Sequence, residues 1–264
     1  MKKLLFSLTI ALSALSAAYG YDIHAFLVCD THSDGIGYSV RENLDNMRSE
    51  LQKAAQHANA NLIEHIYSDD KATTRFLKGI QKLKVDHDDV VIFYWAGHGF
   101  RTYSKSNPWP NFAFYHDDKS VDQWDVTEML MRKHPRLILS IADTCNSYVA
   151  DEYAPHVIHK RRSLTPYNPN ITTNYQALFN QCSGTYIISS SSPGESSWYK
   201  RSGGGFFTNA LLESIREATE VPPPIDWVIV FDSTAAIVMT TNLPEGQNPQ
   251  YQVLEHNLQE YEKQ

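Results

Sequence analysis

The chain has 264 residues and a formal net charge of −7, with 30 acidic residues against 23 basic ones. This length is sufficient for one sizeable α/β domain with a single core. The acidic balance argues against nucleic acid or an anionic membrane as the main partner.

The amino terminus has the pattern of a secretory signal peptide. Lys2 and Lys3 precede an apolar stretch at residues 4–18, which ends in small side chains at Ser16 and Ala18. This stretch is too short for a membrane span without a following stop-transfer pattern. We therefore expect a signal peptide at 1–20, a single domain at 21–264 and export to the periplasm or medium without a stable membrane anchor. An uncleaved anchor or an amphipathic terminus is the alternative.

The three cysteines cannot all pair with one another. In an exported protein an unpaired thiol indicates a reactive group. A disulfide between Cys29 and Cys182 would leave Cys145 free, and two buried thiols are the alternative.

The first half of the chain predicts alternating strands and helices. Strands are expected at 22–29, 62–67, 90–96 and 112–116. Helices are expected where apolar residues recur at spacings of three and four, namely Val40, Leu44, Met47 and Leu51, then Phe76, Ile80 and Leu83, then residues 126–131.

The second half continues the alternation after a change of composition. Strands are expected at 136–142 and 184–190, and a helix from Gly203 to Ala218. Residues 150–176 are charged and rich in proline, which predicts a long exposed loop. Residues 226–242 fit a strand by composition and a helix by length. The order of elements predicts an α/β fold with a mainly parallel central sheet and helices on both faces.

Two of these strands each end at a reactive residue. Residues 90–96 lead into Gly97-His98-Gly99, and residues 137–142 lead into Asp143-Thr144-Cys145. Ligands bind beyond the carboxyl ends of strands in open α/β sheets. An imidazole near a thiol can generate the thiolate that attacks a carbonyl. The chain therefore predicts a cysteine peptidase, although a hydrogen-bonded histidine and a small buried cysteine are the structural alternatives.

These motifs resemble those of caspases and metacaspases. The run from Tyr94 to Gly99 is similar to their strand and Gly-His-Gly turn, and Cys145 follows His98 by about 50 residues, as in caspases. Further similar blocks lie at 186–190, 205–212 and 247–250, so the resemblance spans roughly residues 22–253. It implies a caspase-like fold, a secreted bacterial peptidase and protein or peptide substrates, with no cofactor and no metal required for the reaction.

The resemblance also implies roles for individual residues. Cys145 would be the nucleophile and His98 the general base, with the backbone N–H groups of Gly99 and Cys145 as the oxyanion hole. Asp143 would line a pocket for Arg or Lys at P1, since a carboxylate favours a cation. Capping of a backbone N–H is the alternative for Asp143. Ser189 and Ser190, with Ser191, would form pocket walls.

Several positions depart from the metacaspase pattern. Asn43 stands where an acidic pocket residue is expected, and Tyr148 stands where a glycine is expected, which would narrow the cleft. Asp117, Asp118, Asp122 and Asp125 lie where many metacaspases bind calcium, yet a solvated acidic loop is the favoured interpretation here.

The basic run Lys160-Arg161-Arg162 falls in the predicted loop. A peptidase that prefers basic P1 residues would cut itself there, and a solvated charge cluster is the alternative. As a function of another class, a secreted caspase-like pseudoenzyme would bind proteins without cutting them.

Overall fold

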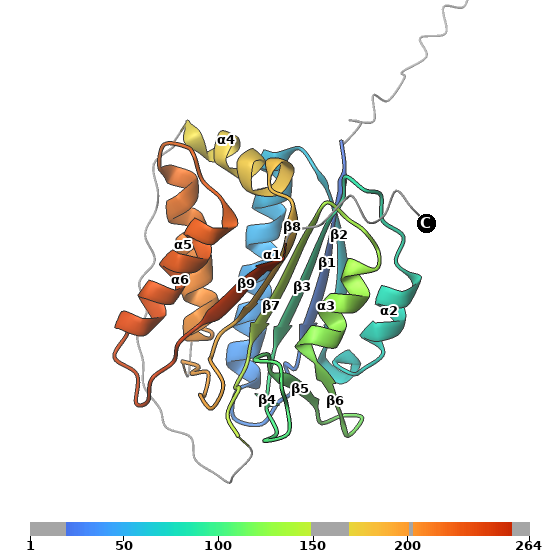
Figure 1. The fold of residues 1–264 in the computed structure, drawn as a ribbon, viewed down its shortest axis with the longest axis vertical. Helices are drawn as coiled ribbons and strands as arrows, with labels where there is room; N and C mark the ends of the chain where they lie inside the picture. The colour runs from blue at the N-terminus through green and yellow to red at the C-terminus, as the bar shows by residue number, and fades with distance from the viewer. Residues whose placement is uncertain (1–19, 149–168, 201–202, 255–264) are drawn as a thin grey trace, which may run out of the picture.

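A six-stranded sheet forms the centre of the molecule (Figure 1). The computed structural model describes residues 20–148, 169–200 and 203–254. The strands lie in the order β2-β1-β3-β7-β8-β9. Their bounds are β1 (Asp22–Cys29), β2 (Asn61–Ser68), β3 (Val90–Ala96), β7 (Leu137–Asp143), β8 (Gly184–Ser189) and β9 (Gln250–Leu254). All neighbours pair in parallel except β8 and β9, which are antiparallel.

The strands are apolar throughout because both faces of the sheet are covered. In β3 the side chains of Val90, Ile92 and Tyr94 enter one core cluster. Those of Val91, Phe93 and Trp95 enter the other, and all are buried. A strand that is buried on both faces has no side exposed to solvent, so its residues do not alternate between apolar and polar. This explains the continuous apolar runs of the sequence.

Helices cover the two faces unequally (Figure 1). One face carries α1 (Gly37–Ala58), α4 (Asn170–Gln176), α5 (Phe206–Glu220) and α6 (Trp227–Thr240), and the other carries α2 (Phe76–Lys82) and α3 (Gln123–Met131). Two short helical segments, η1 (Asp69–Lys71) and η2 (Ala177–Gln181), follow β2 and α4. The predicted fold class, a mainly parallel sheet between two helical layers, is confirmed.

The segment that the sequence left ambiguous, 226–242, forms helix α6. The carboxylate of Asp226 caps it by accepting a hydrogen bond of 2.9 Å from the backbone N–H of Ile229. Trp227, Val230 and Phe231 are buried on its inner side. The helix packs against α5 and against strands β8 and β9 of the central sheet. This tertiary packing overrides the strand propensity of its valines and isoleucines.

The predicted loop at 150–176 is wrong at its carboxyl end, where residues 170–176 form α4. Tyr175 is buried in this helix and Ile171, one turn earlier, packs against the same core. This apolar spacing of four residues outweighs the polar composition around it. The basic run Lys160-Arg161-Arg162 and residues 1–19 of the proposed signal peptide lie outside the described residues.

A small antiparallel sheet follows β3. It consists of β4 (Gly99–Phe100), β5 (Asn111–Phe114) and β6 (Lys119–Asp122), so the strand expected at 112–116 ends two residues early. It packs Phe112 and Phe114 against the second core cluster.

All three cysteines are free thiols, and the disulfide considered between Cys29 and Cys182 is not formed. Cys29 ends β1 at the carboxyl edge of the sheet, whereas Cys182 precedes β8 at the amino edge. The two residues therefore lie at opposite ends of the parallel strands. Within the part of the chain that the structure describes, no helix combines the length and apolar character needed to cross a membrane.

Candidate active site

The structure brings His98 and Cys145 to the same edge of the sheet. Their strands β3 and β7 are adjacent and parallel, and Ala96 pairs with Asp143 at the ends of the two strands. Each reactive residue follows its strand by two positions, as expected from the sequence. Both side chains are half-buried.

Hydrogen bonds join the loops that carry these two residues. The backbone N–H of Gly97 donates to the carbonyl of Asp143 at 3.4 Å, and the Thr144 hydroxyl donates to the carbonyl of Gly97 at 2.8 Å. Gly99 packs so closely that a Cβ there would collide with Thr144 and with the Cys145 carbonyl. The second glycine of the motif therefore permits close approach of the two loops.

The Cys145 thiol is held by the main chain of Ser197. The N–H of Ser197 donates to Sγ at 3.4 Å, and Sγ lies 3.8 Å from the Ser197 carbonyl oxygen. Burial raises the pKa of this thiol above its ordinary value. In the free protein at neutral pH, the thiol is therefore mainly protonated.

The His98 ring packs edge-on against Tyr115, with ring centroids 5.4 Å apart. Among the described residues, no hydrogen bond joins His98 to the Cys145 thiol. Hydrogen bonds between catalytic groups are often long in uncomplexed enzymes and tighten when substrate binds. The oxyanion role of the Gly99 and Cys145 N–H groups stays a prediction.

Asp143 ends β7 with its carboxylate fully buried. The carboxylate accepts hydrogen bonds from the hydroxyl of Thr208 at 2.6 Å, the hydroxyl of Ser197 at 2.8 Å and the amide of Asn43 at 3.1 Å. All three donors are neutral, and burial raises the pKa of the carboxyl. Among the described residues, the partners of the Asp143 carboxyl are therefore dipoles and not cations.

Asn43 and Gly205 cover this carboxylate. The Asn43 side chain donates to Asp143 and accepts from the N–H of Gly205 at 2.8 Å. A Cβ on Gly205 would collide with the Asp143 carboxylate. Asn43, which stands where the metacaspase pattern has an acidic residue, is therefore a neutral partner of Asp143 here.

The serines at the end of β8 support the loop of Cys145. The Ser190 hydroxyl accepts from the N–H of Thr144 and donates to its carbonyl, both at 2.9 Å, and Ser191 also donates to that carbonyl. Ser189 bonds the Ser191 carbonyl. All three are buried in this structure, so their contact with a substrate side chain stays a prediction.

Sequence reasoning missed the roles of Ser197 and Thr208, and it assigned none to Gln247. The Gln247 side chain donates to the Ser190 carbonyl and the Ser197 hydroxyl, and it accepts from the N–H of Trp198 at 3.0 Å. A signal was present for Thr208, because its hydroxyl lies on the buried face of a helix and requires a partner there. Ser197 lies in a loop whose position follows from tertiary contacts alone.

Tyr148 packs beside Arg101, and its effect on the width of the cleft stays a prediction. Its ring stacks on Tyr103 at 4.4 Å, with the Arg101 guanidinium over it at 5.8 Å. Arg101 is itself buried and donates to the carbonyls of Asn107 and Pro108. The Tyr148 ring therefore packs on the loop that contains Arg101 and Tyr103.

Two of the four aspartates considered for calcium, Asp117 and Asp122, have separate structural partners. Asp117 accepts hydrogen bonds from the N–H and hydroxyl of Thr74. Asp122 caps α3 and pairs with Lys105 at 2.5 Å. Within the described ranges, the close groups of three metal-capable side chains include none of Asp117, Asp118, Asp122 and Asp125. A calcium requirement stays a prediction.

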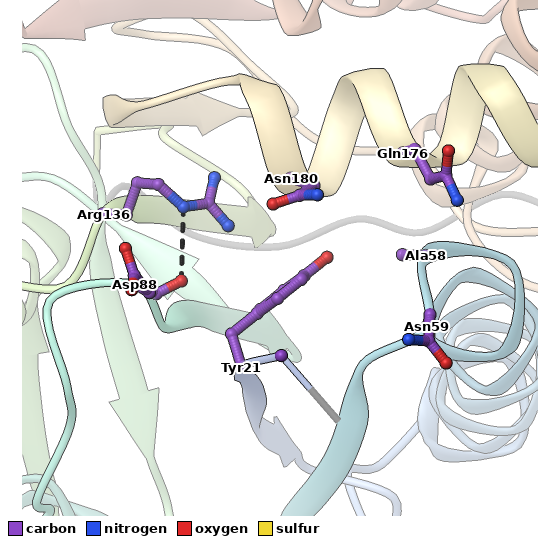
Figure 2. A pocket seen from close by; sticks show the side chains of 8 residues that line it. Tyr21, Ala58, Asn59, Asp88, Arg136, Gln176 and Asn180 are labelled. Carbon is purple, nitrogen blue, oxygen red and sulfur yellow. Dashed lines mark hydrogen bonds between the residues drawn. The ribbon is translucent and has the colours of Figure 1, made fainter. Parts of the chain in front are cut away.

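A separate hollow lies at the amino ends of the strands, away from the candidate site. Tyr21 and Arg136 line it, with the guanidinium 5.1 Å from the tyrosine ring (Figure 2). Arg136 Nε donates to the Asp88 carbonyl. Arg136, which directly precedes β7, therefore holds the start of this strand against Tyr21 and Asp88.

Comparison with known proteins gives one family and one fold. The family described as the caspase domain matches residues 23–256. The crystal structure of caspase-1 from Spodoptera frugiperda superposes with a TM-score of 0.53 at 16% sequence identity, covering 90% of this chain and 87% of that one. At this identity the likeness shows the fold alone. No curated protein sequence matches the chain.

Proposed function

Because the chain belongs to the caspase domain family of cysteine peptidases, we propose that Cys145 and His98 form its catalytic dyad and that it cleaves after Arg or Lys. The main support for this proposal is that hydrogen bonds join the loops at the ends of β3 and β7. The bond between the Thr144 hydroxyl and the Gly97 carbonyl fixes the residues that precede the nucleophile and the base. No cofactor enters the proposed reaction.

The reaction follows from the two side chains. His98 takes the proton of the Cys145 thiol as Sγ attacks the scissile carbonyl, and the Gly99 and Cys145 N–H groups stabilise the oxyanion. The C–N bond then breaks as His98 protonates the leaving amine, and water hydrolyses the acyl-enzyme. Since the thiol is bonded to Ser197 in the free protein, approach of the imidazole accompanies substrate binding.

The buried carboxylate of Asp143 supports the basic P1 preference. A guanidinium or ammonium group would supply the positive charge that the hydroxyls of Thr208 and Ser197 lack. Gly205 covers the carboxylate in the free protein. A P1 side chain therefore reaches Asp143 only after the segment at Gly205 shifts.

The test is an assay of the purified protein on fluorogenic peptides that differ only in having Arg, Lys or Asp at P1. It is run with reductant, with and without calcium. We expect cleavage after Arg or Lys that is abolished in both Cys145→Ala and His98→Ala. Cys182→Ala and His87→Ala are the matched controls, since they remove a thiol and an imidazole elsewhere.

Other results have distinct meanings. Cleavage after Asp would keep the dyad and overturn the assignment of the Asp143 pocket. No cleavage of any of the peptides, with or without calcium, would favour the pseudoenzyme.

We also propose export and self-cleavage from the sequence pattern. The protein would be periplasmic or secreted after loss of residues 1–20, which cell fractionation and amino-terminal sequencing test. Cleavage at Lys160, Arg161 or Arg162 would appear as two fragments by mass spectrometry. Fragments that form equally in Cys145→Ala would contradict self-cleavage.

A further inference from the structure

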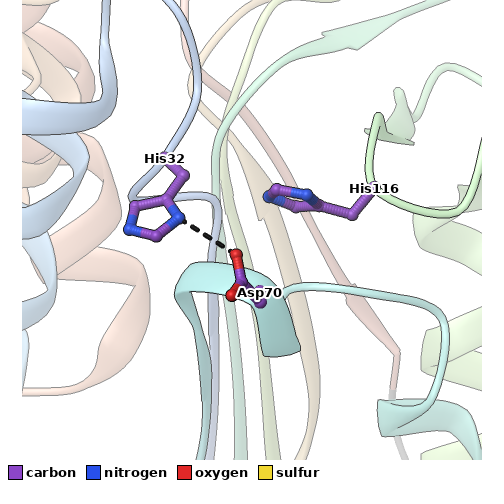
Figure 3. A group of neighbouring side chains, drawn as sticks. All are labelled: His32, Asp70 and His116. Atoms are coloured by element: carbon purple, nitrogen blue, oxygen red, sulfur yellow. Dashed lines mark hydrogen bonds and ion pairs between the residues drawn. The ribbon is translucent and has the colours of Figure 1, made fainter.

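A second cluster of reactive side chains lies beside His98. His32 follows β1, Asp70 lies in η1 after β2, and His116 follows β5 (Figure 3). Each offers one ligand atom, and these three atoms all lie within 4.8 Å of one another. His32 Nδ1 is already 3.3 Å from the Asp70 carboxylate. Three segments far apart in sequence therefore direct nitrogen and oxygen donors at a common point.

The donors identify the class of ligand. Two imidazoles with one carboxylate suit zinc and neighbouring transition metals, whereas calcium and magnesium favour oxygen ligands alone. Tetrahedral zinc with these donors requires ligand atoms on the order of 3.3 Å apart. The side chains of His32 and Asp70 are exposed, so a metal site here requires only that they rotate to bring the three atoms to that separation.

A buried carboxylate beside the cluster provides independent support. Asp30 is 2% exposed, and its Oδ1 has no hydrogen-bond partner among the described residues. It lines one hollow of about 430 Å³ with His32, His116 and His98. Its Oδ1 lies 3.8 Å from His116 Nε2. A carboxylate buried without a full set of partners is costly, so a cation in this hollow would stabilise it.

The neighbouring Asp69 is bonded to other partners. Its carboxylate accepts from Arg41 at 2.6 Å and from the Thr31 hydroxyl at 2.7 Å, and it lies 3.3 Å from His32 Nε2, the ring nitrogen that does not face Asp70. Asp70, by contrast, forms its only ion pair within the described ranges with His32. Asp70 is therefore the residue whose carboxylate is available as the oxygen ligand of the cluster.

We propose that His32, His116 and Asp70 bind one divalent transition-metal ion of the zinc class, with Asp30 as the carboxylate that faces the ion from the hollow. The bound ion would lie in the hollow that His98 also lines. Its charge would oppose formation of the imidazolium that the reaction requires. Metal binding stands independently of the proposed function, whereas inhibition of the peptidase rests on it.

Binding is measured on the purified Cys145→Ala protein, which lacks the thiol that would otherwise compete for metal. Zn²⁺ is titrated against a chromogenic chelator, and Co²⁺ is added to record the visible absorption of a tetrahedral site. We expect one equivalent of metal. His32→Asn and His116→Gln should each weaken binding about tenfold or more, while His87→Asn, an exposed imidazole elsewhere, should leave it unchanged. Circular dichroism confirms that each variant is folded.

Three results would overturn the proposal. These are absence of stoichiometric Zn²⁺ binding, binding by both histidine variants that is as tight as in the parent protein, and binding that only His98→Asn removes. In the active protein, Zn²⁺ should inhibit peptide cleavage, and His116→Gln should raise the inhibitory concentration about tenfold or more. If no peptide is cleaved, the proposed function fails while the binding result still decides the metal site.

Discussion

The hydroxyl of Thr144 donates a 2.8 Å hydrogen bond to the carbonyl of Gly97. Thr144 precedes the proposed nucleophile and Gly97 precedes the proposed base, so this bond joins the two chemical motifs of the chain. Thr144 is fully buried, and its own N–H and carbonyl are bonded by the Ser190 hydroxyl. The separation of the two loops is thus set by polar contacts that solvent does not reach.

Removal of this hydroxyl should misplace the dyad without changing the substrate pocket. Thr144→Val keeps the shape of the side chain but leaves the Gly97 carbonyl without this donor, at a cost of about 1–3 kcal/mol in unfolding free energy. We expect kcat to fall about tenfold or more while KM changes little. Thr144→Ser should restore kcat because it restores the donor. A loss of stability with kcat intact would assign Thr144 a purely structural role.

The sequence predicted the parallel sheet and the edge at which the site lies, because both depend on local patterns. Apolar runs such as 90–96 identify strands buried on both faces, and strand ends in a parallel sheet meet at one edge. The positions of His98 and Cys145 required no further information.

The surroundings of the site could not be predicted in the same way. Ser197 reaches the Cys145 thiol and Asp143 from a loop, and nothing in its own sequence neighbourhood encodes that contact. The secondary structure of segment 226–242 also could not be predicted locally, because its packing against α5 favours the helix over a strand. Contacts between elements remote in sequence determine these features.

The protonation of Cys145 gives a second prediction. Since burial raises the pKa of the thiol, the thiolate that reacts with iodoacetamide is scarce at neutral pH. In the free protein, the rate of Cys145 alkylation should rise with pH without levelling off below about pH 8.5, the ordinary thiol pKa. Mass spectrometry of the Cys145 peptide measures this rate. His98→Ala should give the same profile, and a plateau near neutral pH in the wild type alone would instead show a preformed ion pair.

Asn43→Asp tests the electrostatics of the buried carboxylate. The substitution replaces the donor 3.1 Å from Asp143 by a second buried carboxylate. We expect a loss of about 3–5 kcal/mol in unfolding free energy near neutral pH, because the two like charges are buried together. Urea unfolding measures this loss.

The loss should shrink at lower pH. The pair has a higher pKa in the folded state than in the unfolded state, so folding takes up a proton, and stability recovers as pH falls toward about pH 4. Asn43→Ala removes the donor without adding a charge, so its recovery at lower pH should be smaller. Equal pH dependence in the two variants would contradict charge repulsion as the cause.

Asp143→Asn separates the role of the carboxylate in the fold from its role toward substrate. Burial raises the pKa of Asp143, so ionisation costs stability, and that cost is imposed as pH rises through the ordinary carboxyl pKa toward the folded value. The neutral amide avoids the cost, and the hydroxyls of Thr208 and Ser197 can rotate to suit it. We therefore expect a melting temperature at neutral pH equal to or above that of the wild type.

The same substitution should abolish most cleavage after basic residues. Loss of the charge-assisted contact with a P1 guanidinium should lower kcat/KM for the Arg peptide about 100-fold, or about 2.7 kcal/mol. Asp125→Asn, which neutralises an exposed carboxylate on α3, is the matched control and should leave kcat/KM unchanged. An Asp143→Asn protein that still prefers Arg would place the P1 cation against another group. A protein that loses both stability and activity would instead show that the carboxylate is needed chiefly to hold Asn43, Ser197 and Thr208 in place.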